Sequence, residues 1–156
     1  MGKSIVEQLV TARKWPVIGR FAYYGLVLLG SDIPRMVPIG RNFRLPHWGL
    51  GVVIHNLTTI GDRVSVFSGV TIGRADAYRK TESKFEGVII EDDVVLSTGC
   101  KVMCKEGLLR VGRGTIVGAN AVLLQSTGEW EVWVGVPARC VGSRNRSGVQ
   151  MGEWEE

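Results

Sequence analysis

Residues 60–73 read IGDRVSVFSGVTIG and place aliphatic side chains at Ile60, Val66 and Ile72, six positions apart. This interval fits neither the 3.6-residue period of a helix nor the two-residue alternation of a half-buried strand. The same frame extends in both directions and comprises Ile33, Ile39, Leu45, Ile54, Ile60, Val66, Ile72, Ile90, Leu96, Val102, Val111, Val117 and Leu123. A six-residue repeat predicts an all-β solenoid, a parallel β-helix in which each hexad forms one short strand and a turn, and three hexads close one coil.

The frame is interrupted by gaps of nine, eighteen and nine residues, all of them multiples of three. Stacked coils lie about 4.8 Å apart and tolerate insertions only at their corners. The nine-residue gaps therefore predict small bulges around His47 and Lys105. The eighteen-residue gap is polar at its centre, ADAYRKTESKFEG, and predicts one extruded loop over about 73–89.

The chain divides into three parts by composition: an apolar N-terminal segment over 1–31, the hexad domain over 32–142, and a polar tail over 143–156. In the first part Ile5, Leu9 and Val10 recur at helical spacing before Pro16, which predicts one or two short helices.

The uninterrupted apolar run over 21–29 has nine residues, whereas a bilayer span needs roughly 20. Two alternatives stay open for this part of the chain. It packs against the main domain, or residues 15–30 make a peripheral contact with a membrane surface.

The net charge of +4 comes from scattered Lys and Arg with no basic run, which argues against a nucleic-acid partner. The three cysteines, Cys100, Cys104 and Cys140, are odd in number and lack a disulfide-framework spacing. The N-terminus mixes charged and apolar residues and does not resemble a signal peptide. We therefore expect a cytoplasmic protein, either free or at the inner face of the membrane.

Only two histidines, His47 and His55, are present. A zinc site of three histidines, as in the β-helical carbonic anhydrases, is impossible within one chain, and we expect no metal. His55 follows Ile54 at an outward turn position and is interpreted as a solvated turn residue. Cys100 and Cys104 are interpreted as packed small residues rather than nucleophiles.

Three stretches carry a family resemblance: 60–73, VGRGTIVGANAVL at 111–123 and VGVPARCVG at 134–142. Together with Asp32, Ile39-Gly40-Arg41 and Leu45-Pro46-His47, they resemble the serine acetyltransferase branch of the hexapeptide-repeat acyltransferases. The resemblance covers roughly 32–142. It implies a left-handed β-helix, a homotrimer with active sites between subunits, and acetyl-CoA as co-substrate.

In this resemblance His47 stands where the family has its catalytic histidine, and Asp32 stands where it has the paired aspartate, fifteen residues earlier. An imidazole, with an ordinary pKa near 6.5, can take the proton from a hydroxyl as its oxygen attacks the thioester carbonyl. The carboxylate would orient the ring. Because acetyl would pass directly to the acceptor, no acyl-enzyme is needed. The alternatives are a surface histidine at a corner for His47 and a turn cap for Asp32.

The same resemblance implies a CoA groove near the later coils, where Gly99, Gly118 and Ala119 match the family's small residues. Arg74 and Arg139 are candidate partners of the CoA phosphates, because a guanidinium pairs well with phosphate. The alternative for both arginines is an ordinary solvated side chain.

Two departures from the family bear on the acceptor. Pro46 replaces the aspartate that serine acetyltransferases use for the substrate ammonium, and the 73–89 loop holds no histidine. About thirty apolar-rich residues stand where the family has a large helical domain. This short form looks more like the acetyltransferases of capsule, exopolysaccharide and lipopolysaccharide synthesis, so we expect a saccharide hydroxyl as acceptor. The alternatives are a serine or other amino-acid O-acetyltransferase and a non-catalytic β-helix scaffold.

Overall fold

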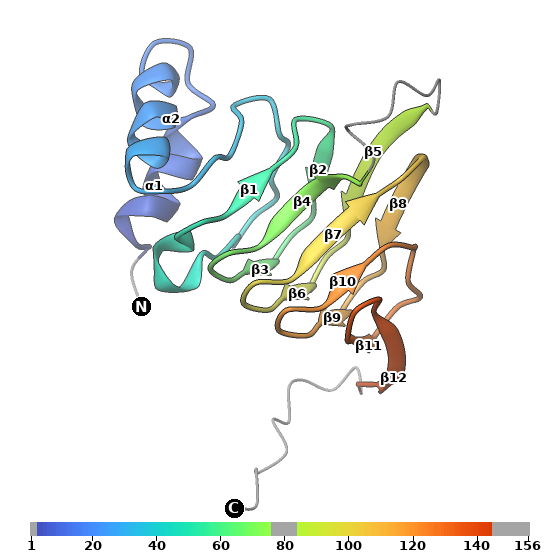
Figure 1. The fold of residues 1–156 in the computed structure, drawn as a ribbon. Coiled ribbons are helices and arrows are strands. Elements are labelled where there is room, and N and C mark those ends of the chain that lie inside the picture. Colours follow the sequence, from blue (N-terminus) through green and yellow to red (C-terminus); the bar gives the residue numbers. More distant parts are fainter. Residues whose placement is uncertain (1–2, 76–83, 145–156) are drawn as a thin grey trace, which may run out of the picture.

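The computed structural model describes residues 3–75 and 84–144. Its strands form three sheets that are parallel throughout except at one C-terminal pair (Figure 1). Sheet A contains β1 (Val53–Ile54), β4 (Thr71–Arg74), β7 (Lys101–Cys104) and β10 (Val122–Leu123). Sheet B contains β2 (Thr58–Ile60), β5 (Phe85–Ile90) and β8 (Gly107–Val111). Sheet C contains β3 (Ser65–Val66), β6 (Val95–Leu96), β9 (Ile116–Val117), β11 (Glu131–Val134) and β12 (Arg139–Ser143).

The register of the sheets follows the hexad frame. Ile54 pairs with Ile72, Ile72 with Val102, and Val102 with Leu123, so equivalent aliphatics of successive coils stack directly. Every aliphatic of the frame is buried and belongs to one continuous core. The prediction of a parallel β-helix with three sides is confirmed, because burial of this column is the main favourable term that can hold such short strands together.

The extruded loop is narrower than its predicted span of 73–89. β4 continues to Arg74, which pairs with Cys104, and β5 begins at Phe85, which pairs with Gly107. The reason is that the neighbouring coil carries its own insertion around Lys105 at the same corner, so both coils extend their strands together. The centre of the loop, 76–83, lies outside the described residues.

The N-terminal segment forms the predicted helices, α1 (Ile5–Ala12) and α2 (Gly19–Leu28). Ser4 and Glu7 form a capping box at the start of α1, and the other Glu7 oxygen, Oε1, accepts a hydrogen bond from the Leu45 N–H at 3.1 Å. The buried Arg13 donates to the Val37 carbonyl at 2.7 Å. These contacts fix α1 on the first coil, and α2 packs against α1. In the described residues, no helix has the length and apolar character that a membrane crossing requires.

The other end of the solenoid is closed by the antiparallel pair of β11 and β12 (Figure 1). Trp133 of β11 is buried at this end, and Arg144 donates a hydrogen bond to the Asp93 carbonyl at 2.7 Å. The predicted tail began at 143, but Ser143 is still part of β12, and residues 145–156 lie outside the described residues.

Candidate active site

His47 lies in a short bulge, the 3-10 segment η1 (Pro46–Gly49), at the edge where the chain passes from sheet C to sheet A. His47 and Trp48 have φ values of 54° and 65°, a left-handed conformation that is uncommon outside glycine and costs backbone energy. The bulge is pinned at Gly49, whose carbonyl accepts from the buried Ser31 hydroxyl at 2.8 Å and from the Val52 N–H at 3.0 Å. The backbone therefore holds the imidazole out on this edge.

The His47 side chain is exposed, and its ring centroid lies 6.4 Å from that of Phe67. Asp32 is hydrogen bonded through its backbone to the segment that follows the bulge: its N–H donates to the Val52 carbonyl at 2.8 Å, and its carbonyl accepts from Ile54 at 2.9 Å. The two predicted catalytic residues thus share one edge. Within 3–75 and 84–144 no hydrogen bond or ion pair joins their side chains.

The Asp32 carboxylate has a different partner, Tyr23 of α2, whose hydroxyl donates to Oδ1 at 3.0 Å. This hydrogen bond is the main reason that the pKa of Tyr23 is raised, with burial and the negative charge of Asp32 adding to it. Tyr23 therefore stays a hydrogen-bond donor through the neutral range. No local sequence pattern indicates this contact, because nothing in the residue spacing shows that α2 lies beside Asp32.

A column of left-handed turns continues the edge beyond His47. Gly51, Gly69 and Gly99 have φ values of 72°, 71° and 72°, and Asn120 follows at 55°. The N–H of Gly69, Gly99 and Asn120 each donates to a carbonyl of the preceding coil, at 2.7, 2.9 and 2.9 Å. A side chain at Gly99 would collide with the Asn120 amide oxygen. We call this feature, from the His47 bulge to Asn120, the C–A edge.

Most of the predicted CoA residues lie along the C–A edge. Gly99 is in the column, and Gly118 and Ala119 form the turn that leads into Asn120, with the Gly118 N–H donating to the Trp133 carbonyl at 2.8 Å. Arg139 follows Ala138, whose N–H donates to the Val122 carbonyl at 2.8 Å at the last coil of the edge.

Arg74 is not part of this gathering. It ends β4 opposite Cys104, at the far end of sheet A from the C–A edge. Three residue steps along a strand separate it from Thr71, a rise of about 10 Å. Within one subunit the structure therefore does not bring Arg74 to His47.

Cys100 and Cys104 are packed side chains, as predicted, whereas Cys140 is exposed. Cys100 is fully buried, and burial raises the pKa of its thiol to about 12, so it is not a thiolate at neutral pH. Cys104 is also buried. His55 differs from its interpretation as a solvated turn residue: its ring packs edge-on against Phe85 at a centroid distance of 4.9 Å, and its Nδ1 accepts from the Leu57 N–H at 3.1 Å.

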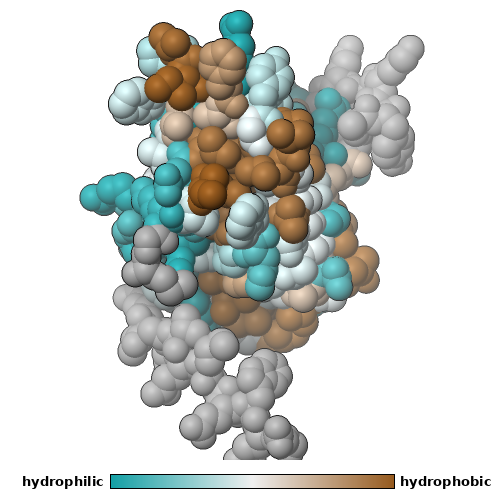
Figure 2. All heavy atoms as spheres, turned by 90° about the vertical axis from the view of Figure 1, so that its left-hand side faces the viewer, coloured by the Kyte–Doolittle hydropathy of each residue, from teal (hydrophilic) through white to brown (hydrophobic). Residues whose placement is uncertain are grey.

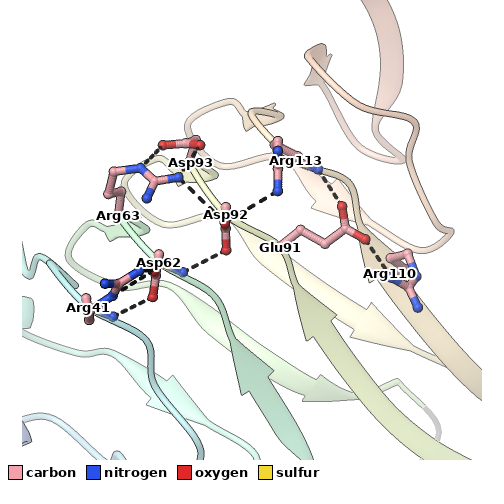
Figure 3. A network of polar contacts seen from close by, with 8 residues as sticks. All are labelled: Arg41, Asp62, Arg63, Glu91, Asp92, Asp93, Arg110 and Arg113. Atoms are coloured by element: carbon pink, nitrogen blue, oxygen red, sulfur yellow. Dashed lines mark hydrogen bonds and ion pairs between the residues drawn. The ribbon is translucent and has the colours of Figure 1, made fainter.

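Charged side chains gather instead on the edge between sheets B and C, which we call the B–C edge (Figure 3). Its pairs include Arg41 with Asp62 at 2.8 Å, Arg63 with Asp93 at 2.6 Å, and Arg110 with Glu91 at 2.6 Å. Hydrogen bonds from the backbone N–H and the guanidinium of Arg41 lower the pKa of Asp62.

Arg63 acts in the same way on the B–C edge, where its guanidinium lowers the pKa of Asp93. Because these charges are paired with one another, this edge offers little free chemistry. No group of three His, Cys, Asp or Glu in the described part of the chain could hold a metal ion.

No family model matches the chain. The serine acetyltransferase of Bacillus licheniformis is 42% identical over 112 residues, which cover 72% of this chain and 48% of that protein. The crystal structure of a serine acetyltransferase from Vibrio cholerae superposes with a TM-score of 0.72 at 26% identity, over 90% of this chain and 54% of that one. Over these lengths the chain is similar in sequence and in fold to serine acetyltransferases.

A further solved acyltransferase of this group, a serine acetyltransferase in complex with CoA, gives a TM-score of 0.70 at 26% identity and covers 87% of this chain and 55% of that one. The chain thus spans about half the length of these relatives. The fold of these relatives is a left-handed β-helix, and the solenoid that superposes on it is therefore left-handed, as the resemblance implied.

The expected likeness to the short polysaccharide acetyltransferases is not supported, since these relatives are serine acetyltransferases. That expectation rested on Pro46, on the 73–89 loop and on the apolar N-terminal segment.

Proposed function

We propose that this chain transfers an acetyl group from acetyl-CoA to a hydroxyl acceptor, with His47 as general base. The observation that carries the proposal is the left-handed bulge at 46–49, which holds the exposed imidazole on the same edge as Gly99, Gly118 and Ala119. Single left-handed residues such as Arg63 and Asp93 also form ordinary corners, but in the described residues only His47 and Trp48 are two consecutive non-glycine residues in this conformation. Such a costly backbone conformation is typical of functional sites. The CoA complex of a homologous serine acetyltransferase supports acetyl-CoA as the donor.

The reaction is a direct transfer. A neutral ring nitrogen of His47 takes the proton from the acceptor hydroxyl while the hydroxyl oxygen bonds to the thioester carbonyl carbon. The tetrahedral intermediate then breaks its bond to sulfur, and the proton on the imidazole passes to the departing CoA thiolate. In this proposal Asp32, on the same edge, orients the ring and stabilises its protonated form, which requires its carboxylate to reach His47 from its present hydrogen bond with Tyr23.

Serine, or another amino acid with a hydroxyl group, is the first acceptor to test, because the homologues are named serine acetyltransferases. A saccharide hydroxyl is the second candidate. Pro46 favours it, since the residue beside His47 carries no carboxylate that could pair with a substrate ammonium.

The working unit in this proposal is a homotrimer, with the second wall of the site supplied by a neighbouring copy. Three large apolar side chains, Trp48, Leu50 and Val53, are exposed around the His47 bulge and would be covered by such a contact. The three described cysteines are free thiols, in keeping with the proposed cytoplasmic location.

The test is release of CoA thiol by the purified chain, with acetyl-CoA and a panel of L-serine, other hydroxy amino acids, sugars and nucleotide sugars. Release that depends on serine supports the first acceptor, and release that depends only on a sugar supports the second. A folded trimer that binds no acetyl-CoA in calorimetry and responds to no acceptor would overturn the proposal in favour of a scaffold.

A further inference from the structure

The α2 helix is apolar on both of its faces. Its inner face is buried through Ala22 and Leu26. Its outer face carries Phe21, Tyr24 and Leu28 at helical spacing, and Phe21 and Leu28 are 76% and 88% exposed. A helix that is hydrophobic all round is normally buried on all sides, so the outer face of α2 lacks a cover.

The exposed face continues into the turn between the two helices. Trp15, Val17 and Ile18 are all exposed there. We call the whole surface the helical-end patch; it consists of Trp15, Val17, Ile18, Phe21, Tyr24 and Leu28. Figure 2 looks at this end of the molecule and shows brown, apolar side chains gathered over it. Scattered exposed apolar residues are ordinary, but a contiguous patch with three aromatic side chains marks an interaction site.

The charge around the patch indicates what covers it. Residues 3–31 hold four cations, of which Arg13 is buried. The three exposed cations, Lys3, Lys14 and Arg20, stand against the single carboxylate of Glu7, which leaves a net charge of +2 at the surface. Glu7 is already engaged in the capping box and with Leu45. A second copy docked on the same face would bring like charges together, whereas an anionic lipid surface complements both the cations and the apolar side chains.

We propose that the helical-end patch docks on the surface of a membrane that contains anionic lipids. Trp15, Phe21 and Leu28 enter the region between headgroups and acyl chains, and Arg20 lies among the headgroups. The attachment is peripheral, since neither described helix is long enough to cross a bilayer. This inference does not depend on the proposed acetyl transfer.

The test is co-sedimentation of the full chain with vesicles of phosphatidylcholine alone and with vesicles that contain a third of phosphatidylglycerol. We expect binding to the anionic vesicles and a loss of at least about tenfold in affinity for Phe21→Ser/Leu28→Ser. The matched control, Leu124→Ser/Val141→Ser, removes two exposed apolar side chains from the solenoid and should bind like the wild type.

Arg20→Gln tests the electrostatic part. Its affinity for the anionic vesicles should fall about fivefold and its affinity for neutral vesicles should not change, because one cation near an anionic surface is worth about that factor. Circular dichroism checks that each variant is folded.

Three results would overturn the proposal. The wild type does not bind anionic vesicles, or Phe21→Ser/Leu28→Ser binds them as tightly as the wild type. The third is that neither protein binds vesicles and the variant has a lower mass than the wild type in light scattering. The last result would assign the patch to contacts between copies of the chain.

Discussion

The B–C and C–A edges are built from the same coils, yet they carry opposite kinds of side chain. On the B–C edge, carboxylates and guanidiniums of successive coils pair with one another, as between Arg63 and Asp93. On the C–A edge the corners are glycines and one asparagine in left-handed turns, and the one histidine is exposed. The difference shows that the B–C edge pairs charged side chains across coils, whereas the C–A edge has its backbone groups hydrogen bonded and carries mainly small residues beside one exposed imidazole.

The largest expected effect concerns the C–A edge. Replacement of His47 by Asn should lower kcat by about 10²- to 10⁴-fold, because proton transfer by a positioned general base contributes that factor. Folding should be unchanged, since the side chain is exposed. The matched control is His55→Asn, which removes the only other histidine and should keep its acetyl transfer. Near-normal turnover by His47→Asn would remove the functional meaning of this edge.

The next effect concerns the B–C edge and is a change in the free energy of unfolding. A methyl group at Gly61 would lie 2.5 Å from Asp92 Oδ1 and 2.8 Å from the Asp92 nitrogen, so Gly61→Ala should cost about 1–3 kcal/mol in urea unfolding. Gly73 also follows a buried isoleucine, but a methyl group there has its nearest neighbour at 4.0 Å, the His55 Cβ. Gly73→Ala should stay within about 0.5 kcal/mol of the wild type. Equal losses of stability in Gly61→Ala and Gly73→Ala would mean that the B–C edge is packed no more tightly than the position after sheet A.

A smaller effect on kcat is expected where α2 contacts the C–A edge, through Tyr23 and Asp32. Tyr23→Phe removes the hydrogen bond to Asp32 and keeps the ring. A hydrogen bond to a charged group is worth about 1.5–3 kcal/mol, and only part of it reaches the imidazole, so kcat should fall about three- to tenfold. The pH profile of kcat should shift, and the KM for acetyl-CoA should not.

The exposed neighbour Tyr24 provides the control for this change, as Tyr24→Phe should behave like the wild type. An unaltered pH profile for Tyr23→Phe would show that Tyr23 only packs.

The smallest effect concerns the charge pairs. Arg63 lowers the pKa of Asp93 in the folded chain, so the pair stabilises the fold above the ordinary aspartate pKa of about 3.9, and this contribution is lost as the pH falls through the folded pKa. Asp93→Asn should lower Tm by at most about 2–4 °C at pH 7, and the difference should vanish in strong acid.

The partner variant Arg63→Gln separates the pair from its surroundings. The double variant Asp93→Asn/Arg63→Gln should lose less Tm than the sum of the two single losses. A constant difference between wild type and Asp93→Asn from pH 7 to pH 2 would contradict the pairing.

The fold was largely predictable because burial in a β-helix repeats at fixed spacing. Every aliphatic of the frame, from Ile33 to Leu123, is buried as predicted. The ends of the strands were not predictable, since β4 and β5 extend only because the next coil is widened at the same corner around Lys105. A pattern within one coil does not show what its neighbour offers as a partner.

The candidate site was predictable only in part. The nine-residue gap located the His47 bulge, because an insertion in a solenoid must leave at a corner. The hydrogen bond of Tyr23 to Asp32 joins a helix to the first coil, and no spacing in the sequence encodes how that helix crosses. The hexad pattern does not show at which end of a sheet A strand Arg74 lies, so its separation from the C–A edge was not predictable.

The antiparallel strand β12 has a consequence for the chain as a whole. In a stack of parallel coils, every coil pairs its backbone with the next one, but the last coil has no partner. Its unpaired N–H and C=O groups can bind another solenoid, so an uncapped solenoid is a template for indefinite end-to-end growth. β12 runs against this direction and covers β11, while α1 and α2 cover the first coil. These two caps occupy the ends of the stack and so oppose its growth into a fibre.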